Sequence, residues 1–271
     1  MTALSNKPVA LVTGGAKRIG AEICRTLHRR GFNVVLHYRH AESEAMQLLE
    51  SLNHDRPGSC VMHQASLCNI EDIESLALFA RQAWGRLDVL VNNASSFYPT
   101  ELSQAKEEDW DELMSSNLKG AFFLSQKLAP ALKVQQGCIV NIIDIYAQNP
   151  LKGHPIYCIA KAGLVAMTQA LALELGPDVR VNGVSPGAIL WPEANEPETN
   201  EPETREPKAS GSKVNESQAF EQGLQQEIIK RTCLQRRGEP QDIAQTVAFL
   251  VEDALFITGQ IIAVDGGRLS R

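Results

Sequence analysis

Short apolar runs alternate with amphipathic stretches along most of the chain. The stretches at 19–31 and 70–84 space their apolar residues at helical intervals, and Gly31 is placed as the C-cap of the first. Near-continuous apolar runs separated by helices are typical of a parallel sheet covered on both faces. The pattern therefore predicts an α/β fold with a doubly wound, seven-stranded parallel sheet. The expected strands are 9–14, 33–38, 60–65, 87–94, 138–143, 179–187 and 260–267.

One segment breaks this alternation. Residues 191–217 hold seven Glu against one Arg and two Lys, with a proline at every fifth position from Pro192 to Pro207. Such spacing forbids a helix, and the segment has almost nothing apolar to bury. We interpret it as a flexible acidic insertion that borders the substrate site, because it follows a strand's carboxyl end; the alternative is an acidic docking segment for a partner. Nothing else divides the chain, so 1–271 is predicted to be a single domain.

Charge and cysteine usage narrow the function classes. The 271 residues carry a formal net charge of −6, which argues against binding to nucleic acid or anionic membranes. No run approaches the roughly 18 apolar residues of a membrane span, and the start shows no secretory signal. The six cysteines are scattered without a CxxC or other metal-ligand spacing, a pattern that favours reduced thiols, a cytoplasmic location and no metal site.

The first expected strand leads into a glycine turn and a helix, T-G-x-x-x-R-x-G. Gly14 and Gly20 allow a tight turn and close packing, and the helix start offers free N–H groups to a pyrophosphate. Within a βαβ unit this predicts a Rossmann-type dinucleotide site; the alternative is a plain strand–helix connector. Arg18 stands within the turn, where it could lie against phosphate or reach toward the substrate.

The end of the second strand selects the cofactor. An NAD site usually has Asp or Glu about twenty residues past the glycine turn, but this chain reads His37, Tyr38, Arg39, His40, with no acid before Glu42. The Arg39 guanidinium suits a 2′-phosphate. We therefore predict NADPH as the cofactor; the alternative is a solvated strand end.

Tyr157 and Lys161 stand four residues apart, which places both on one helix face. A lysine there can lower the pKa of the phenol and can hold a nicotinamide ribose. Asp144 lies thirteen residues before the tyrosine. A carboxylate opposes the negative charge that a carbonyl oxygen develops, but it can relay a proton or accept N–H groups from a nitrogen heterocycle. The structural alternative for Asp144 is a loop cap.

These motifs together resemble the short-chain dehydrogenase/reductase family over almost the whole chain. The family usually has a serine where this chain has Asp144. The stretches "TGGAKRIG", "LHYRHAE" and "NNASSFYPT", with the aspartate and Y-x-x-x-K, are similar to the pteridine reductase subgroup. The resemblance implies an NADPH-dependent reductase of pterins, assembled as a homotetramer through the helices carrying Tyr157 and the C-terminal segment.

The resemblance also implies roles for individual residues. Asp144, Tyr157, Lys161 and Asn117 form the expected catalytic set, with Asn117 positioning the lysine through its backbone. Phe97 would stack a pterin, whereas a core phenylalanine under a loop is the alternative; Tyr98 would line the pocket. The expected substrate residues are Arg18, Ser95, Phe97, Asp144 and Tyr157. The expected cofactor residues are Gly14, Arg18, Ile19, Gly20, His37, Tyr38, Arg39, Ser66, Leu67, Asn93, Ala94, Ser95, Tyr157, Lys161, Pro186 and Gly187.

The interpretation is hydride transfer to the C=N bond of dihydropterins such as dihydrobiopterin or dihydromonapterin, with dihydrofolate as a further candidate. One rival is a carbonyl reductase of the same family acting on a ketone, keto-acyl or sugar substrate. The other is a non-catalytic NADPH-binding sensor whose acidic insertion docks a partner. The intact tyrosine–lysine pair argues against the sensor.

Overall fold

Seven parallel strands form one sheet in the computed structural model, which describes residues 7–189 and 229–270. The strands are β1 (Val9–Val12), β2 (Asn33–Tyr38), β3 (Cys60–Gln64), β4 (Val89–Asn92), β5 (Cys138–Ile142), β6 (Arg180–Pro186) and β7 (Ile261–Val264). Their order is β3-β2-β1-β4-β5-β6-β7, and every neighbouring pair is parallel. The order reverses between β1 and β4, where sheets of this kind bind ligands beyond the carboxyl ends of their strands. The predicted fold class is confirmed.

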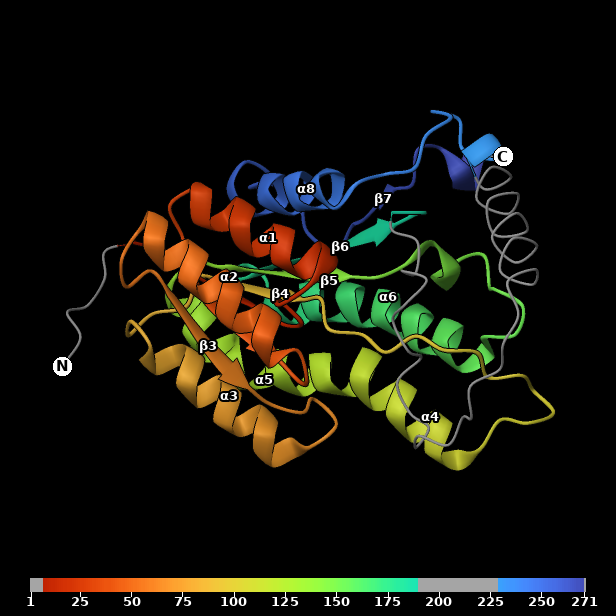
Figure 1. Ribbon diagram of the computed structural model, residues 1–271, viewed down its shortest axis with the longest axis horizontal. Coiled ribbons are helices and arrows are strands. Elements are labelled where there is room, and N and C mark those ends of the chain that lie inside the picture. Colours follow the sequence, from red (N-terminus) through yellow and green to blue (C-terminus); the bar gives the residue numbers. More distant parts are fainter. Residues whose placement is uncertain (1–6, 190–228, 271) are drawn as a thin grey trace, which may run out of the picture.

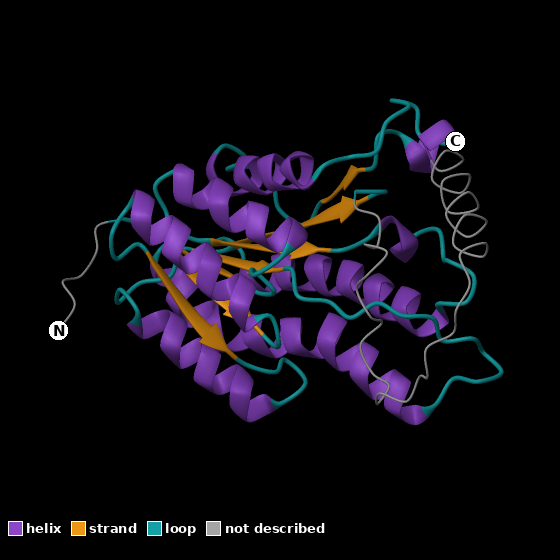
Figure 2. Ribbon diagram, in the orientation of Figure 1, coloured by secondary structure: helices purple, strands orange, loops and turns teal. Residues whose placement is uncertain are grey.

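Helices cover both faces of this sheet, as Figures 1 and 2 show. One layer holds α1 (Arg18–Arg29), α2 (Glu42–Asp55) and α8 (Pro240–Glu252), and the other holds α3 (Ile70–Gln82), α5 (Gly120–Val134) and α6 (Pro155–Leu175). The short helix α4 (Glu107–Met114) precedes α5, and the π-helical turn η1 (Ser115–Lys119) joins the two. The 3₁₀ turns η2 (Ile145–Ala147) and η3 (Arg268–Ser270) follow β5 and β7.

Strand β1 shows why an unbroken apolar run suits this position. Ala10 and Val12 pack into the core on the α1/α8 side, whereas Val9 and Leu11 pack into the core on the α3/α5 side. Because successive strand residues point to opposite faces, a strand buried on both sides needs apolar residues throughout. All four side chains are fully buried.

A ladder of buried polar side chains fixes α6 to the sheet. Asn92 on β4 donates to Asn141 Oδ1 on β5 (2.8 Å), and Asn141 donates to Thr168 Oγ1 on α6 (2.9 Å). Asn92 Oδ1 has no partner among the described residues, so the network is only partly satisfied, but its two hydrogen bonds join β4, β5 and α6. By length and composition α6 could cross a membrane, but here it is a core helix whose inward face carries Tyr157 and Lys161.

The chain leaves the sheet slightly earlier than predicted at β4. Asn93 and Ala94 lie beyond the end of the strand, and their backbone N–H groups donate to Thr13 Oγ1 (2.9 and 3.0 Å). These residues therefore tie the end of β4 to the turn after β1. The predicted insertion at 191–217 lies outside the described residues.

Candidate active site

Asp144 and Tyr157 meet at the carboxyl end of β5. The phenol of Tyr157 donates to Asp144 Oδ2 at 2.8 Å, and Asp144 Oδ1 accepts from the backbone N–H of Tyr146 at 2.9 Å. The carboxylate thus has two functions, because one oxygen caps η2 and the other holds the phenol. The capping alternative and the predicted contact with the tyrosine are both true of Asp144.

Lys161 lies one helical turn beyond Tyr157 and is buried. Its Nζ donates to the carbonyl of Ile142 at 3.0 Å and lies 5.7 Å from the centroid of the Tyr157 ring. The burial of the amine lowers its pKa to about 8, although the charge of Asp144 acts in the opposite direction. A lysine held this way is anchored to the end of β5, with a pKa close to neutral pH.

Burial dominates the acid–base properties of the other two groups as well. It raises the pKa of Asp144 above its ordinary value, against the lowering effects of the Tyr146 amide, Lys161 and Tyr157. Burial and then the neighbouring Asp144 raise the pKa of Tyr157 well above its ordinary value. This direction is opposite to the lowering by Lys161 that the sequence suggested. Both shifts are therefore in the direction of the protonated form.

An aromatic group stands beside the phenol. Phe97, in the loop after β4, meets Tyr157 edge-on with ring centroids 4.8 Å apart and stacks in parallel on His154 at 4.7 Å. It is 52% exposed, so Phe97 is not a core residue under a loop. A flat ring at the solvent edge of the site can stack on a flat ligand.

The loop that carries Phe97 contains other predicted residues. Ser95 is exposed and Tyr98 is partly buried, and burial raises the pKa of the Tyr98 phenol. His154, the residue before α6, was not singled out from the sequence, because its stacking on Phe97 joins residues far apart in the chain.

The glycine turn after β1 is built from close backbone contacts. Gly14 has a φ of +59°, and a Cβ at Gly20 would lie only 2.1 Å from the carbonyl oxygen of Gly14. Asn93 donates from Nδ2 to the carbonyls of Thr13 and Gly14, at 2.9 and 3.0 Å. Only glycine fits these two positions, so the turn and the start of α1 touch.

His37 supports this turn from within the core. The Gly14 N–H donates to His37 Nδ1 (3.1 Å), which leaves Nε2 to donate to the carbonyl of Ala65 (3.0 Å). Burial lowers the pKa of His37 to about 4. The imidazole is therefore neutral at physiological pH and positions the turn. Tyr38, also predicted near the cofactor, is buried and packs in the core.

The start of α1 is suited to an anion. The N-cap residue Lys17 makes no side-chain capping hydrogen bond, so the first N–H groups of the helix lack that cap. Arg18 is exposed and has a φ of +51°, a left-handed conformation that favours glycine. Ile19 follows it, half-buried against the core. Strained residues of this kind cluster at binding sites.

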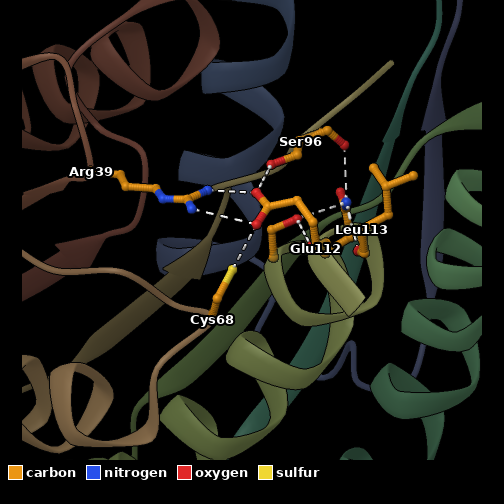
Figure 3. A network of polar contacts seen from close by, with 7 residues as sticks. Arg39, Cys68, Ser96, Glu112 and Leu113 are labelled. Carbon is orange, nitrogen blue, oxygen red and sulfur yellow. Dashed lines mark hydrogen bonds and ion pairs between the residues drawn. The ribbon is translucent and has the colours of Figure 1, made fainter. Parts of the chain in front are cut away.

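Arg39 extends from the end of β2 to Glu112 on α4 (Figure 3). Its two terminal nitrogens lie 2.5 and 3.4 Å from the two oxygens of Glu112. The same carboxylate accepts from Ser96 Oγ at 3.2 Å and from Cys68 Sγ at 3.4 Å. The residue predicted to bind a 2′-phosphate thus has an acidic partner that the sequence did not reveal.

Asn117 lies in the π-helical turn η1, which packs against α6. Its Nδ2 donates to the carbonyls of Leu113 (2.9 Å) and Ser96 (3.0 Å), while Oδ1 is buried without a partner among the described residues. Such turns are frequent at functional sites. The described contacts link Asn117 to the loop of Phe97, and the hydrogen bond of Lys161 goes to Ile142.

The other predicted cofactor residues lie at the carboxyl ends of neighbouring strands. After β3, the backbone N–H of Ser66 donates to Asp72 (2.8 Å), and Leu67 is buried against α5 at Gly120. Pro186 ends β6, and Gly187 lies so close to Asp265 that a Cβ would be 2.6 Å from the Asp265 Cα. All of them share the edge that carries Asp144 and Arg39, because the strands are parallel.

Comparison with known proteins agrees with this architecture. The family model described as enoyl-(acyl carrier protein) reductase matches residues 14–268. The chain belongs to the short-chain dehydrogenase/reductase family. It is 34% identical to pteridine reductase 1 of Leishmania tarentolae, over 98% of both chains. It is 32% identical to the 3-oxoacyl-[acyl-carrier-protein] reductases FabG of Staphylococcus epidermidis (95% of this chain and 97% of the relative) and Thermotoga maritima (96% of each).

Family membership makes the protein an oxidoreductase of a class that uses NAD(P)H. The residues present fit such a cofactor, since the glycine turn leaves no room for a Cβ and the start of α1 has no side-chain cap from Lys17. The glycine turn, Asn93 and Lys161 are the groups that would hold it. The near-equal identities to pteridine and 3-oxoacyl reductases leave the choice of substrate to the site itself.

Proposed function

We propose that the protein is an NADPH-dependent pteridine reductase that reduces the C=N bond of dihydropterins to give tetrahydropterins. The observation that carries the proposal is the hydrogen bond of 2.8 Å between Tyr157 and Asp144, beside the exposed ring of Phe97. NADPH, when bound, supplies a hydride to the substrate carbon.

The residues of the site would supply the proton. In the structure the Tyr157 hydroxyl points its proton at Asp144. Once Asp144 is protonated, its own O–H can donate to Tyr157, which frees the phenol proton for a substrate nitrogen. The raised pKa of Asp144 brings this state closer to neutral pH.

The same groups suit a pterin better than a ketone. An ionised Asp144 would accept N–H groups of an aminopyrimidine edge and would oppose the oxyanion formed from a ketone, whereas a protonated Asp144 would donate to Tyr157 with either substrate. Phe97 offers a face for stacking a flat ring. A 3-oxoacyl reductase is the second candidate, supported by 32% identity to proteins with that activity.

Steady-state oxidation of NADPH would test the proposal with dihydrobiopterin, dihydromonapterin and dihydrofolate against a 3-oxoacyl thioester. We expect kcat/KM for a dihydropterin to exceed that for the thioester by about 100-fold or more, because one misplaced charge at a buried site costs several kcal/mol. Preference for the thioester would overturn the pteridine assignment.

Asp144→Ser tests the role of the carboxylate in the same assay. Loss of a positioned acid–base group typically costs about 10²–10⁴ in rate, so pterin turnover is expected to fall by at least 100-fold while NADPH still binds. Asp178→Ser, at an exposed position, serves as the matched control. Unchanged pterin turnover in Asp144→Ser would show that the carboxylate has no catalytic role.

We also propose a cytoplasmic homotetramer. All six cysteines are free thiols, which fits a reducing compartment, and exposed apolar side chains on α6 and after α8 are available for subunit contacts.

A further inference from the structure

Glu112 lies at the centre of the polar network in Figure 3. Its Oε1 accepts from Arg39 and Ser96, and its Oε2 accepts from Arg39 and Cys68. Three strand ends, after β2, β3 and β4, thus send one donor residue each to a single carboxylate on α4. The network lies at the edge where Arg39 would meet a 2′-phosphate.

The Arg39–Glu112 pair is about one-third exposed. The side chains are 38% and 30% accessible, so water screens their interaction less than that of a surface pair. Burial raises the pKa of the Glu112 carboxyl, but Arg39, Cys68 and Ser96 outweigh it and hold the pKa below its ordinary value. Glu112 is therefore ionised near neutral pH, and both terminal nitrogens of Arg39 face it.

This pairing has a consequence for a phosphate ligand. A guanidinium binds phosphate best when two of its N–H groups are available in parallel. Here Glu112 engages both terminal nitrogens, and its negative charge would remain close to any phosphate that Arg39 binds. A cofactor without the 2′-phosphate does not need the Arg39 guanidinium and places no negative charge beside Glu112.

We infer that Glu112 is a specificity-determining residue for the cofactor, which acts through Arg39 to reduce the preference for NADPH over NADH. The inference rests on the proposed role of Arg39 at the 2′-phosphate. Glu112 offsets the positive charge of Arg39 when no phosphate is present, and this neutralisation lowers the affinity gained from the phosphate.

Equilibrium binding of NADPH and NADH, followed by the fluorescence of the reduced cofactor, tests the inference without turnover. Glu112→Gln keeps the size of the side chain and an oxygen acceptor for Ser96, but removes the charge. We expect the dissociation constant of NADPH to fall about three- to tenfold, the scale of a partly screened charge contact. The dissociation constant of NADH should change less than twofold. Glu108→Gln, an exposed glutamate one turn earlier on α4, should change neither.

Arg39→Gln provides the second half of a double-mutant cycle. It should weaken the binding of NADPH but not of NADH. In its background Glu112→Gln should change the ratio of the two affinities much less than in the presence of Arg39, because only the direct repulsion between Glu112 and the phosphate remains. An effect of Glu112→Gln that is undiminished without Arg39, or a ratio unchanged by Glu112→Gln in the presence of Arg39, would overturn the inference.

The cycle also separates this inference from the proposed function. Wild-type protein that binds NADH as tightly as NADPH, with no change in Arg39→Gln, would refute NADPH dependence itself. Thermal melting of each variant identifies any loss of folding, and 2′,5′-ADP against 5′-AMP repeats the comparison without the nicotinamide ring.

Discussion

At the scale of single residues, Asp144 shows how one side chain can be both structural and chemical. Its Oδ1 caps the turn after β5, and its Oδ2 binds the phenol of Tyr157. A serine at this position has a single, neutral oxygen. It could not offer a separate oxygen to each partner, and it would bring no negative charge to Tyr157. The substitution of the usual serine therefore alters the proton affinity of the site and leaves its framework in place.

Tyr157→Phe removes the hydroxyl that binds Asp144 and, in the proposed function, donates a proton to the substrate. Because the phenol is the expected proton donor, kcat for a dihydropterin should fall by about 10²–10⁴. The dissociation constant of NADPH should stay within a few-fold, since Lys161 and the glycine turn remain. Tyr146→Phe, whose backbone N–H still caps Asp144, is the matched control. Rates near wild type in Tyr157→Phe would contradict the assignment of the donor.

Candidate residues of the site could be named from the sequence, but not their partners. Y-x-x-x-K places Tyr157 and Lys161 on one face because a helix has a fixed period. Glu112 lies 73 residues from Arg39 in sequence, and no local pattern joins two such distant positions. The stacking of His154 on Phe97 was missed for the same reason.

At the scale of elements, the glycine turn depends on neighbours from three strands. His37 on β2, Thr13 after β1 and Asn93 after β4 all hydrogen-bond around it. The spacing of the glycines predicted the turn itself. It did not show that His37 would lie beneath the turn as a buried acceptor, because the composition of β2 does not reveal which side chains point inward.

The buried His37 should make the fold sensitive to acid. Its pKa is about 4 in the folded chain against an ordinary value of 6.5, so the unfolded chain binds a proton first as the pH falls. The contribution of His37 to the free energy of unfolding has its full value above pH 6.5. It is lost as the pH falls from 6.5 to 4, and the loss amounts to up to about 3 kcal/mol.

Urea unfolding at several pH values measures this contribution. His37→Asn keeps an acceptor for the Gly14 N–H and should lose less stability than wild type between pH 6.5 and 4. His54→Asn, at an exposed helix position, should follow the wild-type curve. Equal acid sensitivity in wild type and His37→Asn would show that another group is responsible.

The π-helical turn η1 was also beyond prediction from sequence. The helical periodicity holds within α4 and within α5 on either side of the turn, and no local pattern in the sequence marks the π-helical residues between them. Asn117 in this turn donates to the carbonyl of Ser96, which connects η1 to the loop that carries Phe97.

At the scale of the whole molecule, the sheet was predictable because its five central strands are buried on both faces. Each appears in the sequence as a compact apolar run, and the helices between them force parallel pairing. The surface residues say less about oligomeric state, since exposed apolar side chains are common in monomers and oligomers alike.

The proposed tetramer should depend on the apolar side chains beyond α8. Phe256 is fully exposed and Leu255 is 73% exposed, and Leu173 near the end of α6 is 85% exposed. Side chains exposed in this way are available for contacts between subunits. Light scattering should give about four times the chain mass for wild type and a smaller assembly for Phe256→Glu. Val134→Glu, exposed at the end of α5, should remain tetrameric; a monomeric wild type would refute the assembly.

The distribution of the thiols makes the molecule convenient for spectroscopy. Cys24, Cys60, Cys138 and Cys158 are buried and Cys68 is partly buried, whereas Cys233 is exposed beside the C-terminal segment, with its Sγ 3.3 Å from the carbonyl of Gly267. Burial raises the pKa of the Cys24, Cys60 and Cys138 thiols, which slows their reaction with maleimides. A dye attached at Cys233 would therefore report on the C-terminal end of the chain in otherwise unmodified protein.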